Sequence, residues 1–232
     1  MRLALFDLDH TLLPIDSADT WSHFVVDKGG LDAVTYGARI REFSRTYHAG
    51  TFDIEGYVAF QMKLLSLFPR ATLDTWHRQF MDQHVRPHIR REALQLVDSH
   101  RRLGDELALV TGTNAYVVTP IAREFGIEHV LAVEPEVASD GANGDRFTGG
   151  YVGTHTYQTG KVRKVGEWLA ARGRSWDDTT TICYGDSIND LALLERATIP
   201  IATNADARLR AIARERGWQT LELFAPSLAP AT

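Results

Sequence analysis

Five short runs of apolar residues, separated by segments with helical periodicity, constrain the fold of this 232-residue chain more than any other feature. Continuous apolar runs of four or five residues are typical of parallel strands that are buried on both faces. Strands alternating with helices predict an α/β fold built on a doubly wound parallel sheet. The runs occupy residues 3–6, 107–110, 130–133, 180–184 and 199–202.

One long interval departs from this alternation. Residues 16–87 contain helix-length patterns but no convincing strand, and the interval is too long for a simple crossover between two strands. We interpret it as an inserted helical cap, which divides the α/β core into residues 1–15 and 88–225. Turn signals at Asp140-Gly141 and Asn143-Gly144 predict a small β-hairpin excursion, and residues 226–232 are expected to form a flexible tail.

Composition excludes several classes of protein. The chain has 25 Lys and Arg against 30 Asp and Glu, a net charge of −5, so neither nucleic acid nor a membrane surface is an expected partner. The first apolar run is too short for a signal peptide or a membrane span, so we expect the chain to begin at Met1. The single cysteine, Cys183, excludes an internal disulfide and indicates a reducing cytoplasmic location.

Two carboxylates follow the first predicted strand. Asp7 and Asp9 are two residues apart, so the strand period of two directs both to the same side, at the end of the sheet where ligands bind. Alone, an Asp-x-Asp pair more often marks a strand followed by a polar turn. A second acidic cluster after another strand, with Asp186 and Asp190, favours a site for a hard cation such as Mg²⁺.

Two further segments have the chemistry of a phosphate site. Thr111 and Gly112 follow the strand at 107–110, and Lys161 lies at the start of a predicted helix over residues 161–172. A hydroxyl group, the amides that open a helix and an ammonium group can all bind phosphate oxygens. Each feature is weak alone, and the order of the motifs makes them informative together.

That order resembles the haloacid dehalogenase-like (HAD) phosphohydrolases, over residues 3–16 and 87–204. The inserted cap and the segment Arg146-Phe147-Thr148-Gly149 resemble the phosphoserine phosphatase-like subfamily. The resemblance implies a Mg²⁺-dependent phosphatase in which Asp7 is the nucleophile and Asp9 is the acid and base. It also implies that Asp7, the Asp9 carbonyl and Asp186 hold the metal, with Asp190 orienting or joining them, and that Thr111, Gly112 and Lys161 bind phosphate.

The substrate is less constrained than the reaction. Asp16 occupies the position at which phosphoserine phosphatases usually carry a Glu that binds the substrate amine. Residues 47–65 lack a convincing match to the Arg-containing segment that binds the serine carboxylate. A small phosphorylated metabolite is therefore expected, and histidinol phosphate, which has an amine but no carboxylate, fits at least as well as phosphoserine.

Two alternatives use the same phosphoaspartate: a phospho-acceptor domain of the receiver type, and a phosphotransferase or mutase. The length and the inserted cap argue against a receiver, whereas the sequence does not separate hydrolysis from transfer. His10, within the first motif, is a candidate for gating or substrate contact. The His84 and His88 pair is attributed to chance, Cys183 is expected to be an inert core residue, and the oligomeric state stays open.

Overall fold

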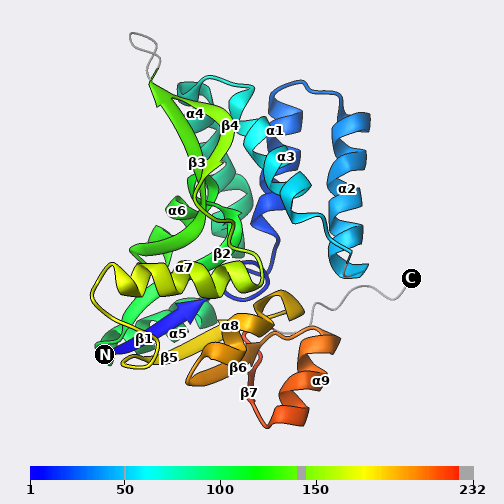
Figure 1. The fold of residues 1–232 in the computed structure, drawn as a ribbon. Helices are drawn as coiled ribbons and strands as arrows, with labels where there is room; N and C mark the ends of the chain where they lie inside the picture. Colours follow the sequence, from blue (N-terminus) through cyan, green and yellow to red (C-terminus); the bar gives the residue numbers. More distant parts are fainter. Residues whose placement is uncertain (50, 140–144, 225–232) are drawn as a thin grey trace.

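The chain forms a seven-stranded sheet covered by helices on both faces, in a computed structural model that describes residues 1–49, 51–139 and 145–224 (Figure 1). The strand order is β4-β3-β2-β1-β5-β6-β7, and only β4 runs antiparallel to its neighbour. The strands are β1 (Arg2–Phe6), β2 (Glu106–Asn114), β3 (His129–Ser139), β4 (Asp145–Val152), β5 (Thr180–Gly185), β6 (Ile199–Thr203) and β7 (Gln219–Leu221). The predicted α/β fold is confirmed.

The central strand β1 divides two hydrophobic cores between the faces of the sheet. Leu3 and Leu5 belong to one core, whereas Ala4 and Phe6 belong to the other, as the strand period of two requires. All four are fully buried, which explains why the run is continuously apolar.

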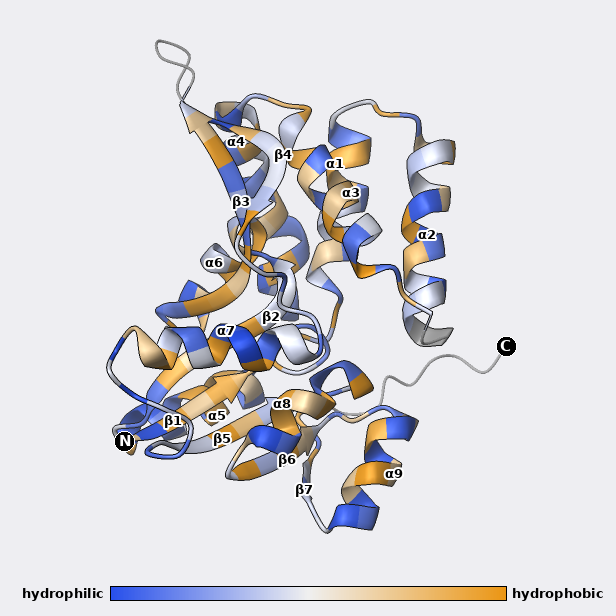
Figure 2. Cartoon of the chain, in the orientation of Figure 1, coloured by the Kyte–Doolittle hydropathy of each residue, from blue (hydrophilic) through white to orange (hydrophobic). Residues whose placement is uncertain are grey.

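Each core is completed by its own set of helices. One core includes residues from α5 (Arg91–Arg102) and α6 (Ala115–Glu124), and the other includes residues from α7 (Thr159–Ala170), α8 (Leu191–Arg196) and α9 (Ala207–Arg216). Figure 2 shows hydrophobic and hydrophilic residues in alternating stripes along these helices, as expected when one side of each helix is buried.

Four helices lie between β1 and α5 in sequence and form a layer beside β3 and β4 (Figure 1). They are α1 (Ser17–Lys28), α2 (Ala33–Ala49), α3 (Ile54–Ser66) and α4 (Arg70–Phe80), followed by a π-helical turn (Met81–Val85) and a 3₁₀ turn (Arg86–His88). The described part of residues 16–87 contains no strand. Trp21, fully buried, packs against Phe24, His77 and Phe80 and joins α1 to α4.

The predicted hairpin is an extension of the sheet. Strand β3 continues to Ser139 and pairs with β4, which lies against α3, where the Tyr151 hydroxyl donates to Glu55. The two turn dipeptides at 140–141 and 143–144, and the expected tail at 226–232, lie outside the described residues. Among the helices that the structure describes, none is both long and apolar enough to cross a membrane.

One expectation about β2 is wrong. Thr111 and Gly112 were expected to follow the end of this strand, but the strand continues to Asn114. Its pairing with β3 is interrupted after Val110 and resumes where Asn114 pairs with Val133. Thr111 and Gly112 therefore lie in an irregular segment inside the strand rather than in a turn after it.

Candidate active site

The first acidic pair lies where the sequence predicts it, directly after β1. The Asp7 amide donates to the Tyr184 carbonyl at 3.0 Å, so sheet pairing with β5 continues up to Asp7. The Asp9 carboxylate accepts hydrogen bonds from the Ser17 amide at 2.8 Å and from the Thr113 hydroxyl at 3.0 Å. These partners come from α1 and β2, so Asp9 is held in place from two sides.

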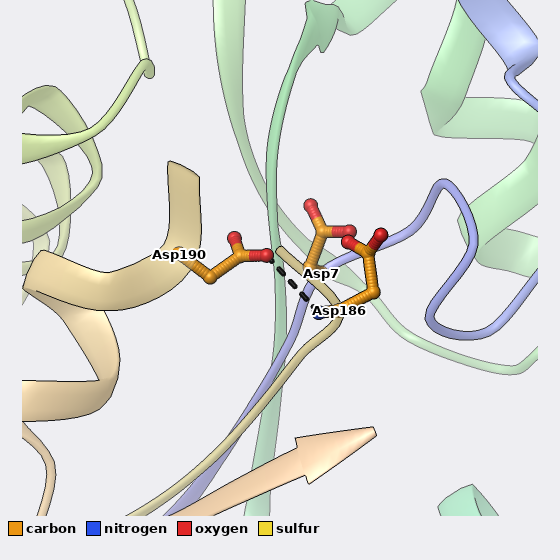
Figure 3. Close-up of side chains that lie close together, drawn as sticks. All are labelled: Asp7, Asp186 and Asp190. Carbon is orange, nitrogen blue, oxygen red and sulfur yellow. Dashed lines mark hydrogen bonds between the residues drawn. The ribbon is translucent and has the colours of Figure 1, made fainter. Parts of the chain in front are cut away.

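The second acidic pair meets Asp7 in space (Figure 3). One carboxylate oxygen from each of Asp7, Asp186 and Asp190 lies within 4.8 Å of the others. Asp190 ends a 3₁₀ turn (Ile188–Asp190), and its Oδ2 accepts from the Asp186 amide at 3.2 Å. Gly185 permits this approach because a Cβ at that position would lie 2.5 Å from the Asp190 Cβ.

Lys161 neutralises part of this charge. Its Nζ donates to Asp7 Oδ1 and to Asp190 Oδ1, both at 2.6 Å, and its side chain is buried. Lys161 lies in the first turn of α7. Gly160, the residue before it in the same turn, lies so close to the His155 carbonyl that a Cβ at position 160 would be 2.2 Å from the carbonyl oxygen. The close packing at Gly160 therefore fixes the helix start that carries Lys161.

Burial and neighbouring negative charges raise the pKa values of the carboxyl groups in the site. Burial raises the pKa of Asp7 to about 6, against the opposing charge of Lys161, and the charge of Asp190 adds to the rise. Burial, together with the charges of Asp16 and Asp7, raises the pKa of Asp9 well above its usual value. Burial and then Asp190 do the same to the pKa of Asp186. A cluster with raised carboxyl pKa values is suited to hold a proton at one position and a cation at another.

The irregular segment of β2 also lines the site, through Thr111, Gly112 and Thr113. The Thr111 carbonyl accepts a hydrogen bond from the buried Thr156 hydroxyl, and the Thr111 Oγ1 accepts from the Thr113 amide at 3.2 Å. These bonds fix a strand interruption that faces the acidic cluster. Thr111 itself is buried and lines the pocket.

All eight residues singled out from the sequence line one pocket of ≈ 390 Å³. They are Asp7, Asp9, Asp16, Thr111, Gly112, Lys161, Asp186 and Asp190. His10 lines it as well, in a left-handed backbone conformation with φ 61°. The pocket is lined by residues at the carboxyl ends of β1, β2 and β5 and by residues of α1, α2 and α3.

Several lining residues were not predicted from the sequence. Asp19 is in the first turn of α1, and Asp206 caps α9. The aromatic residues Phe43, Tyr47, Phe52 and Tyr57 also line the pocket. Asp19 carried a usable signal, because it follows Asp16 by three residues at a helix start.

Asn204 is a further missed residue, and it holds the loop after β1. Its Nδ2 donates to the His10 carbonyl at 2.9 Å and to the Thr11 carbonyl at 3.1 Å, while its Oδ1 accepts from the Leu223 amide at 2.7 Å. The loop after β1 is thereby tied to the segment after β7. A lone Asn after a strand gives no signal of this role in the sequence.

The features set aside in the sequence stay outside the site. His88 Nδ1 lies 2.9 Å from the His84 carbonyl, so this ring bonds to the backbone. Cys183 is a free thiol buried among core residues of the sheet, in agreement with the expected core role.

Comparison with known proteins identifies the family. A family model described as haloacid dehalogenase-like hydrolase matches residues 4–195. The histidinol-phosphatase of Neisseria meningitidis serogroup C strain 8013 is 38% identical over 221 residues, which cover 95% of this chain and 98% of that protein. The phosphoserine phosphatase SerB1 of Mycobacterium tuberculosis strain H37Rv is 30% identical over 225 residues, covering 93% of this chain and 69% of that protein.

A solved structure agrees with this result. The crystal structure of a protein of unknown function from Bordetella pertussis Tohama I is 42% identical, with a TM-score of 0.89 over 96% of this chain and 99% of that chain. The resemblance to phosphoserine phosphatase-like HAD enzymes, and the prediction of a phosphatase, are confirmed by the family match and the named relatives. The chain therefore belongs to the haloacid dehalogenase-like hydrolase family, and it is a phosphatase.

Proposed function

We propose that this phosphatase hydrolyses a small, amine-bearing phosphomonoester through an aspartyl-phosphate intermediate with the help of Mg²⁺, and that histidinol phosphate fits its pocket better than phosphoserine. One observation supports the chemistry above all: Lys161 Nζ lies 2.6 Å from both Asp7 and Asp190, with Asp186 beside them. A nucleophile, a cation and metal-binding oxygens thus face one pocket.

The donor set fits Mg²⁺. The three carboxylates of Asp7, Asp186 and Asp190 are hard oxygen donors, and no sulfur or imidazole belongs to the cluster found among the described residues. Asp7 and Asp186, with the Asp9 carbonyl, would hold the ion. Asp190 accepts from the Asp186 amide and from Lys161, so it orients this group. Bound Mg²⁺ would offset the negative charge of the phosphate as Asp7 approaches it.

Asp7 attacks the phosphorus, and the bond between phosphorus and the ester oxygen breaks. The leaving alkoxide takes a proton from Asp9, whose raised pKa favours the protonated form that this step needs. Asp9 then accepts a proton from water, which attacks the phosphoaspartate and releases inorganic phosphate and Asp7. Ser17 and Thr113 hold the Asp9 carboxylate in position for both steps.

The phosphate oxygens meet two kinds of donor. The Lys161 ammonium contributes a buried positive charge, and the Thr111 hydroxyl and the segment around Gly112 contribute hydrogen-bond donors on the other side. Phosphoryl transfer depends mainly on such positioning and charge stabilisation.

The charges of the pocket favour a cationic leaving group. Seven Asp residues line it, and Lys161 is the only Lys or Arg among the described lining residues. A carboxylate-bearing substrate such as phosphoserine would have no second cation to meet, whereas an ammonium group can bind Asp16. The first relative is named a histidinol-phosphatase, which agrees with this choice.

The receiver alternative has no support in a family of hydrolases. Transfer of the phosphoryl group to an acceptor other than water would use the same phosphoaspartate. Release of free phosphate without an added acceptor separates hydrolysis from transfer.

The test is phosphate release with Mg²⁺ from histidinol phosphate, phosphoserine, a sugar phosphate and a nucleotide. We expect turnover of histidinol phosphate to exceed that of phosphoserine, to stop with EDTA and to return when Mg²⁺ is restored. The Asp7→Asn variant is the control for contaminating phosphatases. Preference for phosphoserine would refute the substrate assignment, and full activity in EDTA would refute the metal.

A further inference from the structure

Five aromatic rings form a continuous wall of the pocket. Phe52 is at its centre, with ring centroids 5.1 Å from Tyr57, 5.3 Å from Tyr47 and 5.3 Å from Tyr157. Phe43 completes the wall at 5.3 Å from Tyr57. All five residues line the same cavity as Asp7 and Lys161. Three of the pairs of neighbouring rings meet edge-on, at 74°, 80° and 89°. Such a wall binds a flat ring by stacking or edge contacts.

An acidic side chain that the proposed chemistry does not use lies beside this wall. Asp19 lines the pocket next to Asp16, whose Oδ1 accepts from the Asp19 amide at 2.8 Å. Among the residues that the structure describes, no hydrogen bond or ion pair involves the Asp19 carboxylate. The charges of both Asp16 and Asp19 act on Tyr57 and contribute to the rise of its pKa, so acids and rings face the same space.

The combination of π faces with carboxylates selects cations. A positive group over an aromatic face is attracted by the ring quadrupole, and a carboxylate nearby strengthens the attraction. Burial, followed by the charge of Asp16, raises the pKa of Asp19 to about 7, so the charged form of Asp19 is disfavoured where it has no partner. A cation or an N–H donor placed there would relieve the repulsion.

We propose that Asp19 and the aromatic wall form a second subsite that binds a planar, nitrogen-containing ring of the leaving group, of the imidazole class, while Asp16 binds its amine. This inference rests on the proposed phosphatase function and extends it from an amine to a ring. The cavity volume of ≈ 390 Å³ lies in the range of about 300–1,000 Å³ for small-molecule pockets, which suits a phosphate, a short chain and one ring.

The test compares substrates that lack the ring or the amine in variants that lack one side chain of the pocket. Three phosphate esters are compared: histidinol phosphate with ring and amine, phosphoethanolamine with the amine alone, and 2-(imidazol-4-yl)ethyl phosphate with the ring alone. The variants are Asp19→Asn, Tyr57→Leu and Asp16→Asn. Asp27→Asn removes the same charge from an exposed position on α1 and is the matched control.

We expect Asp19→Asn and Tyr57→Leu to lower kcat/KM on the order of tenfold for the two ring-bearing esters, the loss typical of one charged or cation–π contact. The loss for phosphoethanolamine should be at most about threefold. Asp16→Asn should lower kcat/KM more for the two amine-bearing esters, histidinol phosphate and phosphoethanolamine, than for the ester that carries the ring alone. In the unaltered enzyme, histidinol phosphate should exceed phosphoethanolamine in kcat/KM.

Equal losses across all three esters in Asp19→Asn would overturn the ring subsite while leaving the phosphatase proposal intact. If none of the three releases phosphate, the substrate proposal fails, and binding then tests the subsite alone. Calorimetry with histidinol, which carries ring and amine but no phosphate, should show binding that Asp19→Asn weakens about tenfold and Asp27→Asn does not. Absence of binding, or equal binding in both variants, would refute the subsite without reference to turnover.

Discussion

Replacement of Lys161 by Met tests the electrostatic organisation of the site most sharply. The substitution keeps a long apolar side chain but removes the ammonium that donates to Asp7 and Asp190 at 2.6 Å. Lys161 is 4% exposed and Asp190 is 1% exposed, so water cannot replace the lost charge. Two buried carboxylates then face each other without compensation.

The expected loss of stability is about 3–5 kcal/mol near neutral pH, the range for removing one partner of a buried ion pair. Proton uptake limits the loss, because a carboxyl group with an ordinary pKa of 3.8 can be protonated near pH 7.5 for about 5 kcal/mol. The folded variant then holds a proton that the unfolded chain releases. Its deficit should therefore shrink by about 1.4 kcal/mol for each pH unit from pH 7.5 down to about pH 6. Below that pH it should change little, because the pKa of Asp7 in the unaltered protein is about 6 and this protein then takes up a proton as well.

The assay is urea unfolding in EDTA, at about pH 7.5 and pH 5.5, for the unaltered protein, Lys161→Met and Lys164→Met. Lys164 lies on the same helix and forms no ion pair among the described residues, so its variant controls for the loss of a charge. Added Mg²⁺ should reduce the deficit because it brings positive charge to the same carboxylates. A loss below about 1 kcal/mol, or one that does not change with pH, would refute this reasoning.

Three further changes have definite expected outcomes. Gly185→Ala places a Cβ 2.5 Å from the Asp190 Cβ, so we expect the free energy of unfolding, measured in urea, to fall by about 1–3 kcal/mol and phosphate release to be reduced. Unchanged values of both would contradict the close approach. Burial lowers the pKa of His77, so the contribution of the neutral ring to folding stability is present above about pH 6.5 and is lost as the pH falls below that value. His77→Gln should therefore flatten this part of the curve of unfolding free energy against pH. An unaltered curve would contradict this prediction. Asn204→Asp keeps a side chain that tolerates φ 47° but places a carboxylate oxygen against the His10 and Thr11 carbonyls, where the Asn204 amide donates. We expect kcat to fall about tenfold with a smaller change in KM. An effect on KM alone would argue against a role of Asn204 in positioning the loop after β1.

The sequence predicted the parts of the site that depend on strand ends. Asp7 and Asp186 follow apolar runs, and the pairing of β1 with β5 brings them together, as parallel strands require. Lys161 and Thr111 were found through the order of the motifs along the sequence. A position at a helix start or a strand end alone does not indicate which distant residues lie beside it. These residues converge on one pocket because β2, β1 and β5 are neighbours in the sheet.

The remaining features depend on packing that periodicity does not encode. Strand β2 was expected to stop at Val110 because polar residues follow, but pairing with β3 resumes after the interruption. The three residues of β7 carry too little pattern to be recognised as a strand. The aromatic wall arises from α2, the loop before α3, α3 itself and the segment before α7. Its rings are therefore adjacent only after α2 and α3 have packed beside the segment before α7.

The central claim is that Asp7 carries the phosphoryl group during turnover. The direct measurement is mass spectrometry of enzyme quenched with acid within the first turnovers of histidinol phosphate and Mg²⁺. We expect an added phosphoryl group on the peptide that contains Asp7, and none in Asp7→Asn. Rapid turnover with that peptide unmodified, or a phosphoryl group found on another residue, would contradict the account.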